Sequence, residues 1–132
     1  MPSPVLYRAA LTTTLALALL APRVATAQDK VYALTEVSNP PKLSSSTTAA
    51  RLIQESYPEG LRKRGVGGMV ELHFIVDANG KVDPTSVEVA DATQTALGEA
   101  ARKVVKRLDF SPGKLNGLNV RTKVVLPIIY KP

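Results

Sequence analysis

The clearest pattern in the chain is an alternation of period two within residues 67–76, "GGMVELHFIV". In an extended segment this spacing places every second side chain on the same face. The apolar face carries Val70, Leu72, Phe74 and Val76. Asn79-Gly80 follows, a pair typical of tight turns between antiparallel strands. The pattern therefore predicts a β-hairpin with one buried face, which other elements must cover because a hairpin alone is marginally stable.

Two segments with a helical period flank this hairpin. The first begins near Thr48, a suitable N-cap, and runs to Tyr57, where Pro58 ends it or starts a second short helix. The second covers residues 93–110, "TQTALGEAARKVVKRLDF". Its apolar positions recur at i, i+4, i+7 and i+11: Leu97, Ala101, Val104 and Leu108. Both helices present an apolar stripe that can pack on the hairpin.

A last strand is predicted over residues 119–130, "NVRTKVVLPIIY", with alternate residues facing inward. The order helix, hairpin, helix, strand indicates an α+β fold. It predicts a small antiparallel three-stranded sheet with two helices packed on one face.

Pro127 places this last strand at a sheet edge for at least part of its length, because proline has no N–H to donate to a neighbour. Two interpretations remain open. Lys123 and Pro127 can protect the edge against unwanted pairing. Alternatively, the edge is a receptor for an extended peptide that adds as a further strand.

The N-terminus has the pattern of an export signal. Arg8 precedes an apolar run over residues 9–21, and Ala25-Thr26-Ala27 is a suitable cleavage site. The run is too short for a bilayer core of about 30 Å. We therefore predict a signal peptide over residues 1–27, an extended Pro/Ser-rich arm over 28–47 and one domain over 48–132, with an uncleaved anchor as the alternative.

Composition and charge limit the classes of partner that this protein can have. Removing residues 1–27 takes away Arg8 and Arg23 and no acidic residue, which lowers the formal charge from +6 to +4. An exported chain does not meet a genome, so a nucleic-acid partner is not expected. The basic cluster Arg62–Arg64 is interpreted as a solvated helix end, with an anionic partner such as lipid headgroups as the alternative.

The sequence contains no pattern of residues that indicates catalysis. The chain has no cysteine and one histidine, His73, which is predicted on the outer face of the hairpin beside Glu71. Asp77 and Asp83 flank a turn, where aspartate is common for backbone reasons. We therefore expect no enzyme, no cofactor and no metal site.

Several short motifs, in this order and spacing, resemble the C-terminal domain of the TonB family of energy transducers. They are Tyr57-Pro58, Gly65-Val66-Gly67-Gly68 before a hydrophobic strand, Asp77-x-x-Gly80-Lys81-Val82, Ala100-Ala101, Phe110-x-Pro112 and the terminal "LPIIY". Two positions depart from the family pattern. Leu108 stands where an aromatic residue is usual, and Ala90-Asp91-Ala92 replaces a Ser-Ser-Gly-like turn.

The resemblance implies a periplasmic domain that grasps an extended segment of an outer-membrane TonB-dependent transporter by β-strand addition. Carried over by position, the partner-binding residues are Gln54, Tyr57, Pro58, Val120, Arg121, Lys123, Val125, Pro127 and Ile129. Energy transduction also implies an inner-membrane motor complex or a tethered partner. The alternatives are a soluble envelope peptide-binding module without that role, and a homodimer formed through the same edge strand.

Overall fold

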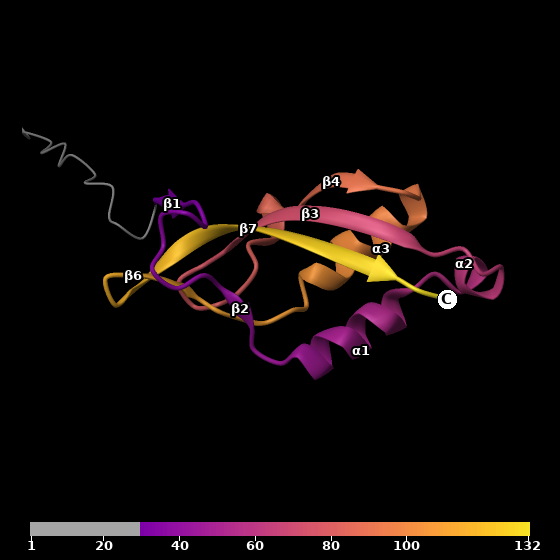
Figure 1. The fold of residues 1–132 in the computed structure, drawn as a ribbon, viewed down its shortest axis with the longest axis horizontal. Helices are drawn as coiled ribbons and strands as arrows, with labels where there is room; N and C mark the ends of the chain where they lie inside the picture. The colour runs from indigo at the N-terminus through magenta and orange to yellow at the C-terminus, as the bar shows by residue number, and fades with distance from the viewer. Residues whose placement is uncertain (1–29) are drawn as a thin grey trace, which may run out of the picture.

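The computed structural model describes residues 30–132, so the predicted signal peptide lies outside the described part. Its centre is an antiparallel sheet in the order β7-β3-β4 (Figure 1). These strands are β3 (Gly68–Val76), β4 (Glu88–Ala92) and β7 (Leu118–Tyr130). The register runs from Gly68 opposite Tyr130 to Val76 opposite Thr122. The predicted hairpin and terminal strand are therefore neighbours in one sheet.

The turn after β3 forms as the sequence predicts. The side chain of Asp77 accepts hydrogen bonds from the backbone N–H groups of Asn79 at 2.8 Å and Lys81 at 3.0 Å. Gly80 adopts a positive φ of 82°, and a Cβ there would collide with the carbonyl oxygen of Phe110. Asp83 is the N-cap of a 3-10 helix, η1 (Pro84–Ser86), which precedes β4.

Helices α1 (Ser46–Ser56) and α3 (Thr95–Val105) cover one face of this sheet, and the short α2 (Glu59–Lys63) follows Pro58 (Figure 1). This confirms the predicted α+β class. Two predicted boundaries are wrong. Helix α1 begins two residues before Thr48, because Ser45 is the N-cap and its side chain accepts from the N–H of Thr48 at 3.2 Å. Helix α3 ends at Val105 rather than at residue 110, because the chain leaves it to form another strand.

Additional short strands extend this core. The arm that precedes α1 contains β1 (Val31–Tyr32), which pairs parallel to β7, and β2 (Lys42–Leu43), which pairs antiparallel to β5 (Phe110–Ser111). Between them Ser38 and Asn39 donate backbone hydrogen bonds to the carbonyl oxygen of Lys114 at 2.8 and 3.1 Å. Lys114 belongs to β6 (Gly113–Leu115), which forms a hairpin with β7. The described part of the arm is thus paired to the domain at three places.

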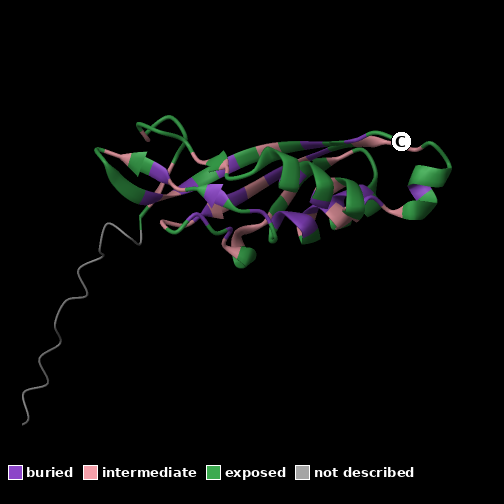
Figure 2. Cartoon of the chain, turned by 90° about the horizontal axis from the view of Figure 1, so that it is seen from below, coloured by how far each residue is buried: buried purple, intermediate pink, exposed green. Residues whose placement is uncertain are grey.

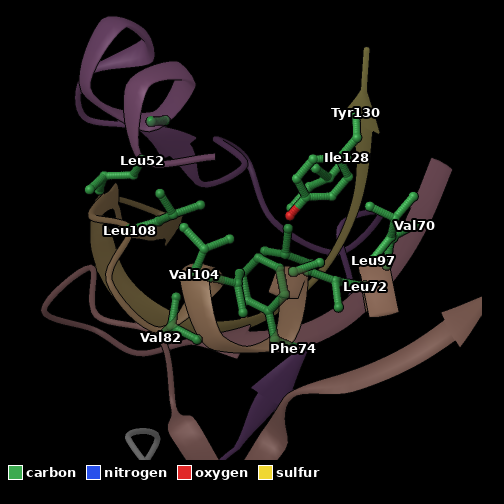
Figure 3. Packing of buried hydrophobic residues seen from close by; sticks show 14 of the residues in the cluster. Leu52, Val70, Leu72, Phe74, Val82, Leu97, Val104, Leu108, Ile128 and Tyr130 are labelled. Atoms are coloured by element: carbon green, nitrogen blue, oxygen red, sulfur yellow. The ribbon is translucent and has the colours of Figure 1, made fainter. Parts of the chain in front are cut away.

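The hydrophobic core lies between the sheet and helices α1 and α3 (Figure 3). Figure 2 shows buried and exposed residues alternating along the strands, as the period of two requires. Phe74 at the centre of β3 is 1% exposed, and its ring packs against that of Phe110 with the ring centres 5.6 Å apart. The inward face of β7 contributes Val120, Val124, Ile128 and Tyr130, all buried. No helix in residues 30–132 has the length and apolarity that crossing a bilayer requires.

Leu108 fills the position where the family pattern has an aromatic side chain, and it is 2% exposed. Replacing it with alanine is expected to lower the free energy of unfolding by about 2–5 kcal/mol, as truncation of a buried leucine does. Urea unfolding of the variant measures this difference. A change below about 0.5 kcal/mol would contradict the burial of this side chain.

Candidate functional site: an open sheet edge

Strand β7 is paired along only part of the side that faces away from β3. Strand β1 occupies that side at Arg121 and Thr122. Strand β6 pairs with residues 118–120, which precede the ladder between β3 and β7. Among residues 30–132, no strand pairs with β7 beyond Thr122 on this side. The C-terminal half of β7 therefore has one free edge.

Hydrogen bonds of β3 show which backbone groups of β7 lie on this edge. Thr93 N–H donates to the carbonyl oxygen of Met69 at 3.0 Å, and Asp83 N–H donates to that of Ile75 at 2.8 Å. Both acceptors therefore point away from β7. Backbone direction alternates along an antiparallel ladder, so every second residue of β3 forms a non-hydrogen-bonded pair with β7.

The β7 partners of these residues direct their backbone groups to the free side. Val125, Pro127 and Ile129 lie opposite His73, Glu71 and Met69. The N–H groups of Val125 and Ile129 and the carbonyl oxygens of all three therefore point outward. We call the backbone of Val125, Pro127 and Ile129 the open edge. Pro127 removes no hydrogen bond between β3 and β7, because its missing N–H would have pointed to the open edge.

The open edge carries apolar side chains on the solvent face of the sheet, where Glu71 and His73 lie opposite Pro127 and Val125. Ile129 is 59% exposed, Val125 45% and Met69 43%. Met69 lies directly opposite Ile129 in the register. An added strand would therefore meet apolar neighbours on the face that the helices do not cover.

The C-terminal end of α1 lies beside the end of β7 (Figure 1). The ring of Tyr57 packs edge-on against that of Tyr130, with ring centres 5.2 Å apart. The hydroxyl group of Tyr57 donates to the carbonyl oxygen of Val66 at 2.7 Å. Gln54 and Tyr57 line one surface hollow, and Pro58 is the next residue in the chain. Of the predicted helix-end residues, Tyr57 therefore contacts the end of the edge strand.

Two other predicted partner-binding residues lie outside the open edge. Val120 is 5% exposed and pairs with Gly113 in the β6–β7 hairpin. Arg121 pairs with Val31 of β1, and its guanidinium group lies 3.0 Å from the carboxylate of Asp83. Hydrogen bonds from the side chain and backbone of Thr85 are the main cause that lowers the pKa of Asp83, and Arg121 adds to it. Lys123 stands at the border between β1 and the open edge.

Tyr130 links the end of β7 to α1, because its hydroxyl group lies 3.0 Å from the side-chain oxygen of Ser56. Burial raises the pKa of Tyr130, while the bond with Ser56 acts in the opposite direction. Above about pH 10 the unfolded chain loses this proton before the folded one does, so stability falls as the pH rises further.

We expect the Tyr130→Phe variant to lose less stability than the unchanged protein between about pH 9 and pH 11. Urea unfolding of both proteins at both pH values measures the difference. The comparison cancels the contributions of all groups that the two proteins share. Equal losses in the two proteins would show that Tyr130 ionises alike in the folded and unfolded states.

His73 and two residues of the basic cluster, Lys63 and Arg64, have nearby partners in the structure. His73 is half-buried on the outer face, and its Nε2 lies 2.8 Å from the carboxylate of Glu71. Lys63 lies 3.0 Å from Glu59, and Arg64 donates to the carbonyl oxygen of Gly60 at 3.0 Å, so both are engaged within their own helical turn. Within the described residues no group of three or more His, Asp or Glu side chains could hold a metal ion.

Sequence reasoning missed the boundary of the site. A two-residue strand such as β1 has no periodicity to detect, and its partner lies about ninety residues away in the chain. The apolar residues Val31, Tyr32, Leu34 and Val37 of the arm were the available signal. This strand decides where the open edge starts.

Comparisons with known proteins identify the family of this chain. The family model described as "Gram-negative bacterial TonB protein C-terminal" matches residues 53–132, which is more than half of the chain. The chain is 30% identical over 94 residues to "Protein TonB" of Vibrio cholerae serotype O1. That match covers 71% of this chain but 38% of the relative, so the chain corresponds to well under half of the relative's length.

Two solved structures are also similar. The solution structure of the Pseudomonas aeruginosa TonB C-terminal domain matches with a TM-score of 0.49 and 21% identity, covering 58% of this chain and 76% of that one. The Helicobacter pylori TonB C-terminal domain matches with a TM-score of 0.38 and 20% identity, covering 67% and 85%. On the match of the family model over residues 53–132, the chain belongs to the TonB C-terminal family.

Proposed function

We propose that this domain works in the periplasm and captures an extended segment of an outer-membrane TonB-dependent transporter. The segment adds as a strand to the open edge of β7. The observation that carries the proposal is the set of unpaired backbone groups at Val125, Pro127 and Ile129. Family membership supports the class of partner.

Strand addition suits a domain that transmits force, because the backbone hydrogen bonds of the added strand give affinity without demanding one sequence. The apolar side chains of Val125 and Ile129 favour a segment with apolar residues at alternate positions. Capture would support energy-dependent transport if an inner-membrane motor complex or a tethered partner supplies the force.

A photo-crosslinking residue at Lys123 tests the proposal in the native envelope. Lys123 is exposed and borders the open edge, whereas Lys42 is exposed on the separate β2–β5 sheet and is the matched control. We expect a crosslink to an outer-membrane transporter from position 123 and none from position 42. Equal crosslinking from both positions would contradict capture at this edge.

A second candidate is an envelope peptide-binding module without energy transduction. The paired arm favours it, because residues 31–43 are held on the domain instead of serving as a spacer. The intact mass of the protein from its own envelope fraction distinguishes the two. A mass that starts at Gln28 favours this module, and a mass that retains residues 1–27 in the inner-membrane fraction favours the transducer.

A further inference from the structure

The net charge of the described chain lies entirely in its helical layer. Residues 46–64 and 95–107, which contain the three helices, carry eight Lys and Arg against three Asp and Glu. The rest of residues 30–132 carries seven of each kind. The positive excess of five therefore sits on one layer, and the layer formed by the strands and loops is neutral overall.

Three exposed cations lie together at the end of α3. Lys103, Lys106 and Arg107 are exposed, and none has a carboxylate within 4.0 Å among the described residues. The other five cations of the layer are engaged within their own helix or at its end. Arg64 donates to the carbonyl oxygen of Gly60 at 3.0 Å. Arg51, Arg62, Lys63 and Arg102 each lie within 4.0 Å of a glutamate on their own helix.

The helix dipole accounts for part of this arrangement, because cations near a helix C-terminus are favourable. The helix dipole does not account for the hollow that lies beside these cations. A hollow of about 210 Å³ opens between α1 and α3 and is lined by Ser56, Ala100, Lys103, Val104 and Arg107. Two of the unpaired cations thus border a hollow to which Ala100 and Val104 contribute apolar atoms.

This combination fits an amphiphile better than a purely charged polymer. A phospholipid offers a phosphate to the cations and hydrocarbon to the hollow, and the stems of Lys103 and Arg107 can lie along apolar surface while their charges reach the headgroups. A nucleic acid or an acidic peptide would use the charges and leave the hollow unfilled.

We propose that the face formed by Lys103, Lys106 and Arg107 docks on a membrane surface rich in anionic phospholipid. Docking there turns the solvent face of the sheet, with Val125 and Ile129, away from the lipid. The proposal is independent of peptide capture, because it uses residues on the opposite layer of the domain (Figure 1).

Sedimentation of the full chain with lipid vesicles tests the proposal. One vesicle type is pure phosphatidylcholine, and the other contains about 30% phosphatidylglycerol. The test variant is Lys103→Gln/Lys106→Gln/Arg107→Gln. The matched control, Lys42→Gln/Lys114→Gln/Lys131→Gln, removes the same charge from exposed positions outside the helical layer. All three proteins carry residues 1–29, so any contribution of the apolar run is common to them. Circular dichroism confirms that the variants fold.

We expect the unchanged chain and the control to bind the phosphatidylglycerol vesicles at least about tenfold more tightly than the neutral ones, with the preference weakening as salt rises. The test variant should lose the preference. Equal weakening in both variants would overturn the proposal in favour of bulk charge alone. Equal binding of the unchanged chain to both vesicle types would overturn it as well. Full competition by a DNA duplex against the vesicles, dependent on the same three residues, would also overturn the proposal, because it would indicate general polyanion binding.

Discussion

Replacing Val125 with proline is expected to weaken capture of an extended peptide at least about tenfold while the fold persists. The backbone N–H of Val125 points to the open edge and not to β3, because Val125 lies opposite His73 in a non-hydrogen-bonded pair. Proline removes that donor and places its ring where the added strand would lie. Pro127 already occupies the equivalent position two residues later, so β7 tolerates this substitution pattern.

The matched control is Val125→Thr, which retains the N–H and the branched shape. Titration with the N-terminal segment of a TonB-dependent transporter from the same genome gives the dissociation constants, and urea unfolding gives the stabilities. If proline reduces binding no more than threonine does, backbone pairing at Val125 is not the basis of capture. A loss of stability as large as the loss of binding would contradict the assignment of this N–H to the free edge.

Replacing Phe74 with alanine is expected to lower the free energy of unfolding by about 3–5 kcal/mol, the largest stability effect that we predict for a single substitution. Phe74 lies at the middle of β3, is 1% exposed and packs on the ring of Phe110. Domains of this size have total stabilities of about 5–15 kcal/mol, so the loss would leave a marginal fold.

Phe74→Leu serves as the control because it keeps most of the buried volume, and we expect a clearly smaller loss. Thermal and urea unfolding followed by circular dichroism measure both variants. Similar losses for alanine and leucine would indicate that the aromatic pair, and not the filled volume, stabilises this part of the core.

Local patterns predicted the elements that position the site. The alternation around Phe74 indicates a strand with one buried face. Gly80 has a positive φ, which is the reason that Asn-Gly is typical of such turns. Pro127 predicted an edge, and the register shows that its missing N–H lies on that edge. These inferences succeeded because each depends on a few residues that are adjacent in the chain.

The remaining features depend on contacts between distant segments. The end of α3 at Val105 follows from the pairing of Phe110 with Leu43 of the arm, and a helical pattern that continues to Leu108 hides it. The pairing of Val31 with Arg121 is equally non-local, yet it removes Arg121 from the open edge. Sequence patterns therefore predicted the edge strand but not the length of edge that is free.

The most direct test of peptide capture is amide hydrogen exchange, measured by NMR with and without the transporter segment. The C-terminal half of β7 and strand β4 each have one unpaired side among the described residues, so they provide an internal comparison. We predict that the amides of Val125 and Ile129 become strongly protected on binding, while those of Glu88–Ala92 do not change. Protection confined to β4, or binding that leaves both Val125 and Ile129 unprotected, would contradict strand addition at the open edge.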